Sequence, residues 1–168
     1  MKPVSIMPAN LDWPSAIGHF LLNFGTLDYF VFVFLKKHLS PEEFADVKEK
    51  TFRERIRRIA QHLKDKNYPL EEQAAFARMV ERVEPFRELR NHIAHGHMYL
   101  RLDADGKAAV TVFKAKDLDM GYLPDSKHVE FEELERALET LPQLIEEFER
   151  LAGFKASVSG PFVENLKK

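Results

Sequence analysis

The sequence contains no cysteine among its 168 residues. This excludes a disulfide framework, a thiol nucleophile, a cysteine-based zinc site and an iron–sulfur cluster. No glycine-rich phosphate loop is present, and no local arrangement of Ser, His and Asp suggests a hydrolytic triad. The first residues lack the apolar core of a signal peptide. Since the absence of cysteine also fits a reducing compartment, we expect a cytoplasmic protein.

The amino-acid composition is that of an ordinary globular protein. Hydrophobic residues make up 45% and charged residues 31% of the chain, which excludes disorder and collagen-like structure. A chain of this length matches one domain and buries about two-thirds of its unfolded surface. We predict a single domain over residues 1–153, followed by a loosely ordered tail over residues 154–168.

The charges are unevenly distributed although the formal net charge is only −2. Residues 48–66 carry eight cationic side chains against three acidic ones, whereas residues 117–150 carry three cationic against eleven acidic. Two interpretations stay open at this level. The segments are either opposite faces that steer an anion or promote self-association, or two solvated helix faces.

The most apolar stretch, residues 16–35, contains His19, Asn23 and Asp28. A charged carboxylate is costly inside a bilayer, so we expect a buried helix over residues 16–39 and no membrane span. Because this helix is apolar on most sides, we expect it to be buried all round, by its own bundle or by a partner subunit. Residues 30–34 alone would also fit a strand.

Three further helices and a hairpin are predicted along the chain. A capping box at Ser40 and Glu43 starts a helix that runs to about residue 66 and leaves His62 outside its apolar stripe. The third helix spans residues 70–95 and contains Pro85, which should bend or split it. Two β-like runs, residues 97–102 and 108–114, flank an Asp-Gly turn signal.

The last helix should span residues 131–152, with a kink at Pro142 and a C-cap at Gly153. The predicted fold is therefore all-α, an up-and-down four-helix-type bundle with a small β-hairpin between the third and fourth helices. The 14 phenylalanines are expected to form the core and an interface between subunits, in preference to a surface on which bases stack.

One cluster of residues carries chemistry, at the end of the third helix. The segment Arg90-Asn91-His92-Ile93-Ala94-His95-Gly96-His97 holds a guanidinium, an amide and three imidazoles. Asn91 and His95 share a helix face, whereas Arg90 and His95 lie roughly 140° apart around the axis. The arginine must therefore wrap around the helix, or another element or subunit must complete the site.

This segment resembles the signature of the HEPN superfamily, an Arg followed by four to six residues and a His. Arg90, the polar Asn91 and His95 match it, near the end of a long helix in a small helical bundle. The resemblance covers most of the chain in architecture but only about seven residues in motif. It implies a bundle that dimerises with two motifs facing each other, and for many members a metal-independent ribonuclease that acts as a toxin or defence effector.

The implied chemistry is consistent with these residue types. RNA carries its own nucleophile, the 2′-hydroxyl, so cleavage needs no metal or other cofactor. His95 would act as general base or acid, Arg90 would stabilise charge on the phosphoryl oxygens, and Asn91 would orient the phosphate or His95. The expected partners are a second copy of the chain, RNA, and an antitoxin or other protein.

Alternative interpretations of the same residues stay open. In one alternative the three residues are structural. His95 and Asn91 cap the last carbonyls of the helix, and Arg90 pairs with a carboxylate such as Glu88 or one from the acidic last helix. In a second alternative His92, His95 and His97 are ligands of a metal ion, since imidazole is a common zinc ligand. We predict no metal site. The domain could also be a non-catalytic module that binds a nucleotide or a protein, or a plain helical interaction protein.

Two interpretations also stay open for the arginines of the second predicted helix. Arg53, Arg57 and Arg58 are candidate contacts to an RNA backbone, or they form an ordinary solvated helix face.

Overall fold

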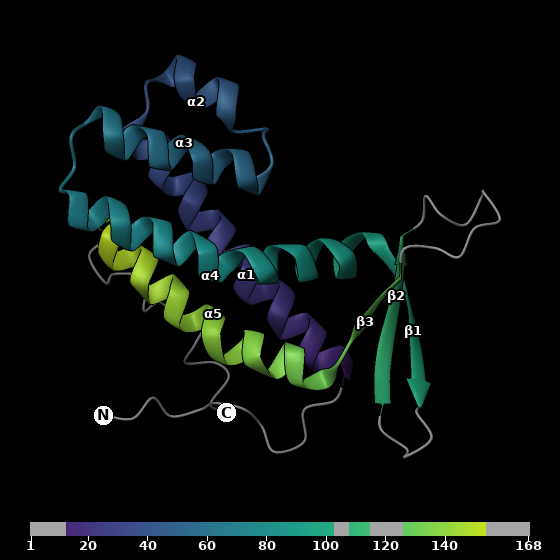
Figure 1. Cartoon of the computed structure of the whole chain (residues 1–168). Coiled ribbons are helices and arrows are strands. Elements are labelled where there is room, and N and C mark those ends of the chain that lie inside the picture. Colours follow the sequence, from purple (N-terminus) through teal and green to yellow (C-terminus); the bar gives the residue numbers. More distant parts are fainter. Residues whose placement is uncertain (1–12, 103–107, 115–125, 154–168) are drawn as a thin grey trace, which may run out of the picture. The chain divides into compact units, whose positions relative to one another are not determined.

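The computed structural model describes residues 13–102, 108–114 and 126–153, with the backbone alone for residues 97–102, 108–114 and 126–128 (Figure 1). The helices are α1 (Trp13–His38), α2 (Pro41–Val47), α3 (Phe52–Asp65), α4 (Leu70–His95) and α5 (Phe131–Leu151). The strands are β1 (Gly96–Leu102), β2 (Ala108–Lys114) and β3 (Ser126–Val129). The predicted tail, residues 154–168, lies outside the described residues.

The prediction of a mainly helical protein is confirmed, but the prediction of four helices is wrong. Five helices lie in the described residues, because the expected second helix is divided into α2 and α3. A second capping box causes the division: the Thr51 hydroxyl accepts from the backbone N–H of Glu54, and the Glu54 carboxylate accepts from the backbone N–H of Thr51 at 3.0 Å. The sequence carries this signal as Thr-x-x-Glu directly before an apolar run.

The two proline residues inside long helices do not end them. Pro85 lies within α4 and Pro142 within α5. Gly153 has a φ of 60°, the left-handed conformation that terminates a helix, so it caps α5 as the sequence predicts. Residues 30–34 are helical, which excludes the strand alternative.

Contacts divide the chain into two compact units. Unit 1 comprises Met1–Gly25 and Arg82–Pro142, and unit 2 comprises Thr26–Glu81 and Gln143–Lys168. The helices α1, α4 and α5, which are labelled in Figure 1, each contribute residues to both units.

Unit 1 contains the beginnings of α1 and α5, the end of α4 and the strands. The Trp13 and Phe131 rings meet edge to face with centroids 5.1 Å apart, which fixes the first turns of α1 and α5 to each other. Its fully or nearly buried apolar side chains include Ala16, Phe20, Phe24, Val83, Leu89, Ile93, Val129, Leu134, Ala137 and Leu141.

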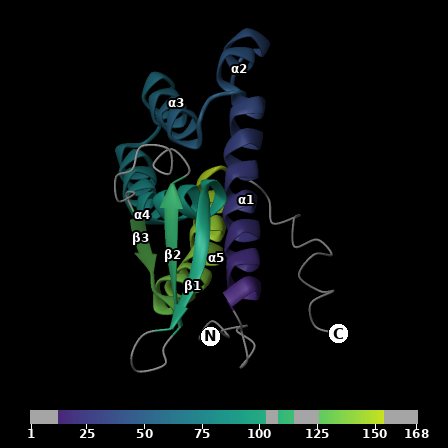
Figure 2. The same ribbon diagram turned by 90° about the vertical axis from the view of Figure 1, so that its right-hand side faces the viewer.

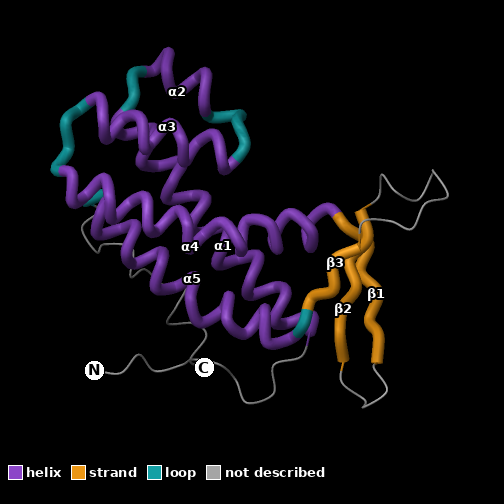
Figure 3. The backbone as a smooth tube through the Cα atoms, in the orientation of Figure 1, coloured by secondary structure: helices purple, strands orange, loops and turns teal. Residues whose placement is uncertain are grey.

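The strands form a three-stranded antiparallel sheet in the order β1-β2-β3, drawn in orange in Figure 3. In β1 and β2, Gly96 pairs with Lys114 and Leu102 with Ala108. In β2 and β3, Val110 pairs with Val129 and Phe113 with Ser126. Figure 2 shows the three strands side by side, with α5 following β3.

Unit 2 is built around aromatic side chains. Phe34 of α1 and Phe76 of α4 both contact Phe148 of α5, at centroid distances of 6.2 and 6.3 Å. Phe34, Phe76 and Phe148 are at most 3% exposed. The phenylalanines named here therefore act as core residues, as expected.

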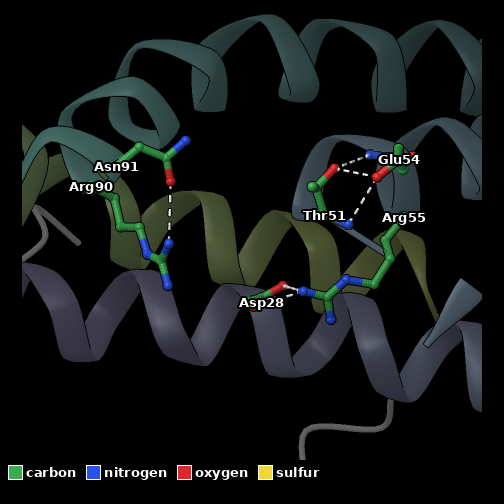
Figure 4. A network of polar contacts seen from close by, with 6 residues as sticks. All are labelled: Asp28, Thr51, Glu54, Arg55, Arg90 and Asn91. Atoms are coloured by element: carbon green, nitrogen blue, oxygen red, sulfur yellow. Dashed lines mark hydrogen bonds and ion pairs between the residues drawn. The ribbon is translucent and has the colours of Figure 1, made fainter. Parts of the chain in front are cut away.

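Within a single chain α1 is not buried all round, and burial of its remaining side by a partner subunit stays a prediction. Leu22 is 69% and Tyr29 60% exposed, so one side of the helix is open. The charge inside α1 has a partner: the Arg55 Nη2 lies 2.6 Å from Asp28 Oδ1 and 2.9 Å from Oδ2 (Figure 4). By length and composition α1 is also long and apolar enough to cross a membrane, and 33% of its most apolar stretch of 18 residues is buried. Core helices of soluble proteins and signal sequences can have the same length and apolar composition.

Candidate functional site

The predicted site residues lie in the last two turns of α4, within unit 1. The helix continues through Pro85 to His95, and β1 begins at the next residue, Gly96. The apolar face of these turns is anchored by Leu89, which is completely buried, and Ile93, which is 5% exposed. The intervening polar residues Arg90, Asn91 and His92 are half-buried.

Arg90 and Asn91 contact each other. The Arg90 Nη1 donates a hydrogen bond to Asn91 Oδ1 at 3.2 Å, as Figure 4 shows. Both residues are half-buried, and in the described part of the chain no carboxylate pairs with Arg90. The structural alternative with an Arg90–Glu88 pair is therefore not the one that this structure contains. The bond to Asn91 is the one hydrogen bond that Arg90 makes with the described residues, and it uses one of the five N–H groups of the guanidinium.

Glu88 instead lies 3.5 Å from Arg87. Arg87 also forms a two-point bond with Glu84, with both nitrogen–oxygen distances at 2.8 Å. The hydrogen bond to Glu84 raises the pKa of Arg87 above its ordinary value. Arg87 is thus a neutralised structural arginine, and Arg90, one turn further along α4, is not.

His92 and His95 differ in the same way. The His92 Nδ1 lies 2.8 Å from the carbonyl oxygen of Glu88, one turn back. Because a carbonyl only accepts, His92 must carry its proton on Nδ1. His95 is exposed at the last position of the helix, and no side-chain contact to Arg90 or Asn91 is found in the described residues. The structure therefore joins Arg90 to Asn91 and leaves His95 separate and open to solvent.

The metal alternative receives no support from the described residues. No group of three or more His, Asp or Glu side chains that could hold a metal ion is found among them. The side chain of His97 lies outside the described part.

The candidate RNA contacts on α3 do not behave alike. Arg53 and Arg57 are exposed, whereas Arg58 lies 2.5 Å from Glu43 and 3.8 Å from Asp65. The guanidinium of Arg58 therefore links α2 to α3, and Arg53 and Arg57 remain available to a ligand.

Sequence reasoning missed a second histidine cluster, in unit 2. His62 was predicted to lie outside the apolar stripe of α3, but it is only 5% exposed and faces His38 with ring centroids 5.6 Å apart. The available signal was its spacing: His62 follows the buried Ile59 by three residues, which places both on one helix face.

Comparison of the chain with protein-family models, with curated proteins and with solved structures found no match. The resemblance to the HEPN superfamily therefore rests on the segment from Arg90 to His95 and on its helical setting.

Proposed function

We propose that the chain is a metal-independent endoribonuclease of the HEPN type, an up-and-down helical bundle with a hairpin after its motif helix. The observation that carries the proposal is the contrast at the end of α4. Arg87 and His92 are held by protein groups, whereas among the described residues Arg90 has only Asn91 as a hydrogen-bond partner and His95 is exposed. Of the side chains that match the motif, Arg90 and His95 are the two proposed to contact a phosphodiester.

In this proposal, His95 takes the proton of a 2′-hydroxyl as general base. The resulting oxygen attacks the adjacent phosphorus, and the bond to the 5′-oxygen breaks. Arg90 stabilises the negative charge on the non-bridging oxygens, with Asn91 holding the guanidinium through its carbonyl oxygen. The products are a 2′,3′-cyclic phosphate and a 5′-hydroxyl, which takes up a proton.

One histidine cannot serve as base and acid at the same moment. We therefore propose a homodimer in which two motifs face each other and the partner's copy of the same histidine protonates the leaving oxygen. Such a pairing would also bring Arg90 and His95 of different subunits together, although they point roughly 140° apart on one helix. The proposed cellular role is that of a toxin or defence effector in the cytoplasm.

The experiment is cleavage of single-stranded RNA by the purified chain in EDTA. We expect cleavage by the wild type and a loss of about 10²- to 10⁴-fold for Arg90→Ala and for His95→Ala. The matched controls are Arg87→Ala and His92→Gln, which remove the same side-chain types from the same helix and should keep most of the activity.

Two outcomes would overturn the proposal. Either no RNA is cleaved by any variant, or the loss is the same for the motif variants and their controls. Thermal stabilisation by a nucleotide that disappears in Arg90→Ala, without any cleavage, would identify a binding module instead.

The dimer is tested by mixing wild type with His95→Ala in equal amounts after reversible unfolding. If each cleavage needs the His95 of both subunits, a mixed dimer is inactive. Since only a quarter of the dimers are then wild-type pairs, about a quarter of the rate of an equal amount of wild type should remain. A site built within one subunit would keep about half of that rate, which would contradict the shared site.

A further inference from the structure

Unit 2 contains two imidazoles packed against each other, of which His62 is buried and His38 is half-buried. His38 is the last residue of α1, and His62 lies in the last turn of α3. Their ring centroids are 5.6 Å apart at an interplanar angle of 61°. We call these two residues the imidazole pair.

The surroundings of the imidazole pair are largely aromatic. Phe34 stacks on His38 with centroids 4.3 Å apart and meets His62 edge to face at 6.0 Å. Tyr68, in the segment between α3 and α4, lies 6.3 Å from His62. His62 is 5% exposed and His38 is half-buried, so a charge on either ring is less well solvated than in water.

The His38 Nε2 is buried and has no hydrogen-bond partner in the described part of the chain. A neutral ring can leave this nitrogen as an unprotonated acceptor, at modest cost. A protonated ring must carry an N–H there with no acceptor, which is more costly in a buried position.

Cationic side chains near the imidazole pair also oppose the protonation of either ring. Lys37 faces His38 from α1, and Arg58 and Lys66 face His62 from α3 and the residue after it. Glu43 of α2 and Asp65 of α3 act in the opposite direction, but both are also close to Arg58. From α4, Glu72 lines a small apolar cavity beside Phe34 and Phe148. Burial is the largest cause that lowers the pKa of each histidine, and the neighbouring cations add to it.

We propose that the imidazole pair is an acid-operated latch, in which proton uptake by His38 or His62 separates the last turn of α1 from the last turn of α3. In the closed form both rings are neutral and packed on Phe34. In the open form a protonated ring is hydrated and the two turns are apart. The chain between the two turns, which contains α2, is then no longer held at both ends by the imidazole pair. The same cationic surroundings argue against a divalent metal between the two rings.

The first test is a titration of the histidine rings by NMR in the wild-type protein between pH 7.5 and 5. We expect the His38 and His62 rings to titrate below the ordinary histidine value of about 6.5. This measurement needs no variant, so it remains decisive if substitutions impair folding. Titration of both rings at or above 6.5 would overturn the proposal.

The second test is hydrogen exchange at pH 7.5 and 5.5, a range chosen above the titration of the capping carboxylates Glu43 and Glu54. Protection of amides in residues 35–39 and 59–66 should fall more than that of other helices. The limit is about tenfold per pH unit for each proton taken up. A uniform fall over all helices would contradict a local latch.

The variants separate the pair from other titrating groups. The double variant His38→Phe/His62→Phe keeps the ring packing and should lose the extra acid sensitivity, whereas His19→Gln, which removes a histidine from unit 1, should retain it. Persistence of the local fall in the double variant would also overturn the proposal. A failure here leaves the ribonuclease proposal untouched, because that proposal is read from RNA cleavage.

Discussion

The end of α4 and the facing ends of α1 and α3 carry the same residue types in opposite environments. At the end of α4, His95 is exposed, and among the described residues Arg90 has only Asn91 as a hydrogen-bond partner. In unit 2, His62 is 5% exposed and contacts His38 and Phe34. The comparison shows that burial decides the role of an imidazole. An exposed ring can exchange a proton with a substrate, whereas a buried ring converts proton uptake into a loss of stability.

The largest expected effect breaks the buried side of this comparison. Phe34→Ala removes a ring that is 3% exposed and contacts His38, His62 and Phe148. The free energy of unfolding should fall by about 3–5 kcal/mol, because the residual cavity adds to the lost burial. Urea unfolding measures this fall. Leu22→Ala on the open side of α1 is the control and should change the free energy by less than about 0.5 kcal/mol; equal effects would refute the assignment of the core.

The ion pair between Asp28 and Arg55 should have the next largest effect. Arg55→Ala leaves a partly buried carboxylate without its partner and should lower the free energy of unfolding by about 2 kcal/mol. Arg53→Ala removes an exposed arginine from the same helix and should cost less than about 0.5 kcal/mol. A double-mutant cycle with Asp28→Asn isolates the pairwise energy, and a coupling near zero would contradict a stabilising pair.

The pH dependence sharpens the comparison in unit 2, where His38 and His62 are linked to folding. Burial lowers the pKa of His38 and His62, so the unfolded chain binds more protons than the native protein as the pH falls below about 6.5. Their contribution to stability is complete above pH 6.5 and is lost as the pH falls through the lowered values. Urea unfolding at pH 7.5 and 5.5 should show a steeper loss in the wild type than in His38→Phe/His62→Phe. Equal slopes would show that the pair is not linked to folding.

The smallest effect concerns the boundary between α2 and α3. Thr51→Ala removes the side-chain cap of α3 and should lower the free energy of unfolding by about 1 kcal/mol. Thr51→Ser keeps the hydroxyl and should retain most of the stability. If both variants unfold alike, the capping box does not contribute.

The sequence allows much of this fold to be predicted where a local signal is strong. The capping box at Ser40, the continuous apolar pattern of α4 and the terminating Gly153 are all found where the sequence places them. The division between α2 and α3 was predictable from Thr51 and Glu54 but is hidden by the helical spacing of the apolar residues on either side.

The remaining features depend on tertiary packing. The burial of His62 and the open side of α1 follow from which surfaces meet, and periodicity alone does not determine this. At the candidate site, the sequence indicates the residue types and their spacing. That Arg87 is neutralised while Arg90 is not depends on side-chain positions that no motif specifies.

The most direct test of the account measures two quantities on His95→Ala: the initial rate of RNA cleavage in EDTA and the free energy of unfolding. The predicted result is a rate about 10²- to 10⁴-fold below that of the wild type, with products ending in a 2′,3′-cyclic phosphate for the wild type, and a free energy of unfolding within about 0.5 kcal/mol of it. An unchanged rate, or a loss of rate that is matched by a loss of stability, would contradict an exposed catalytic histidine at the end of α4.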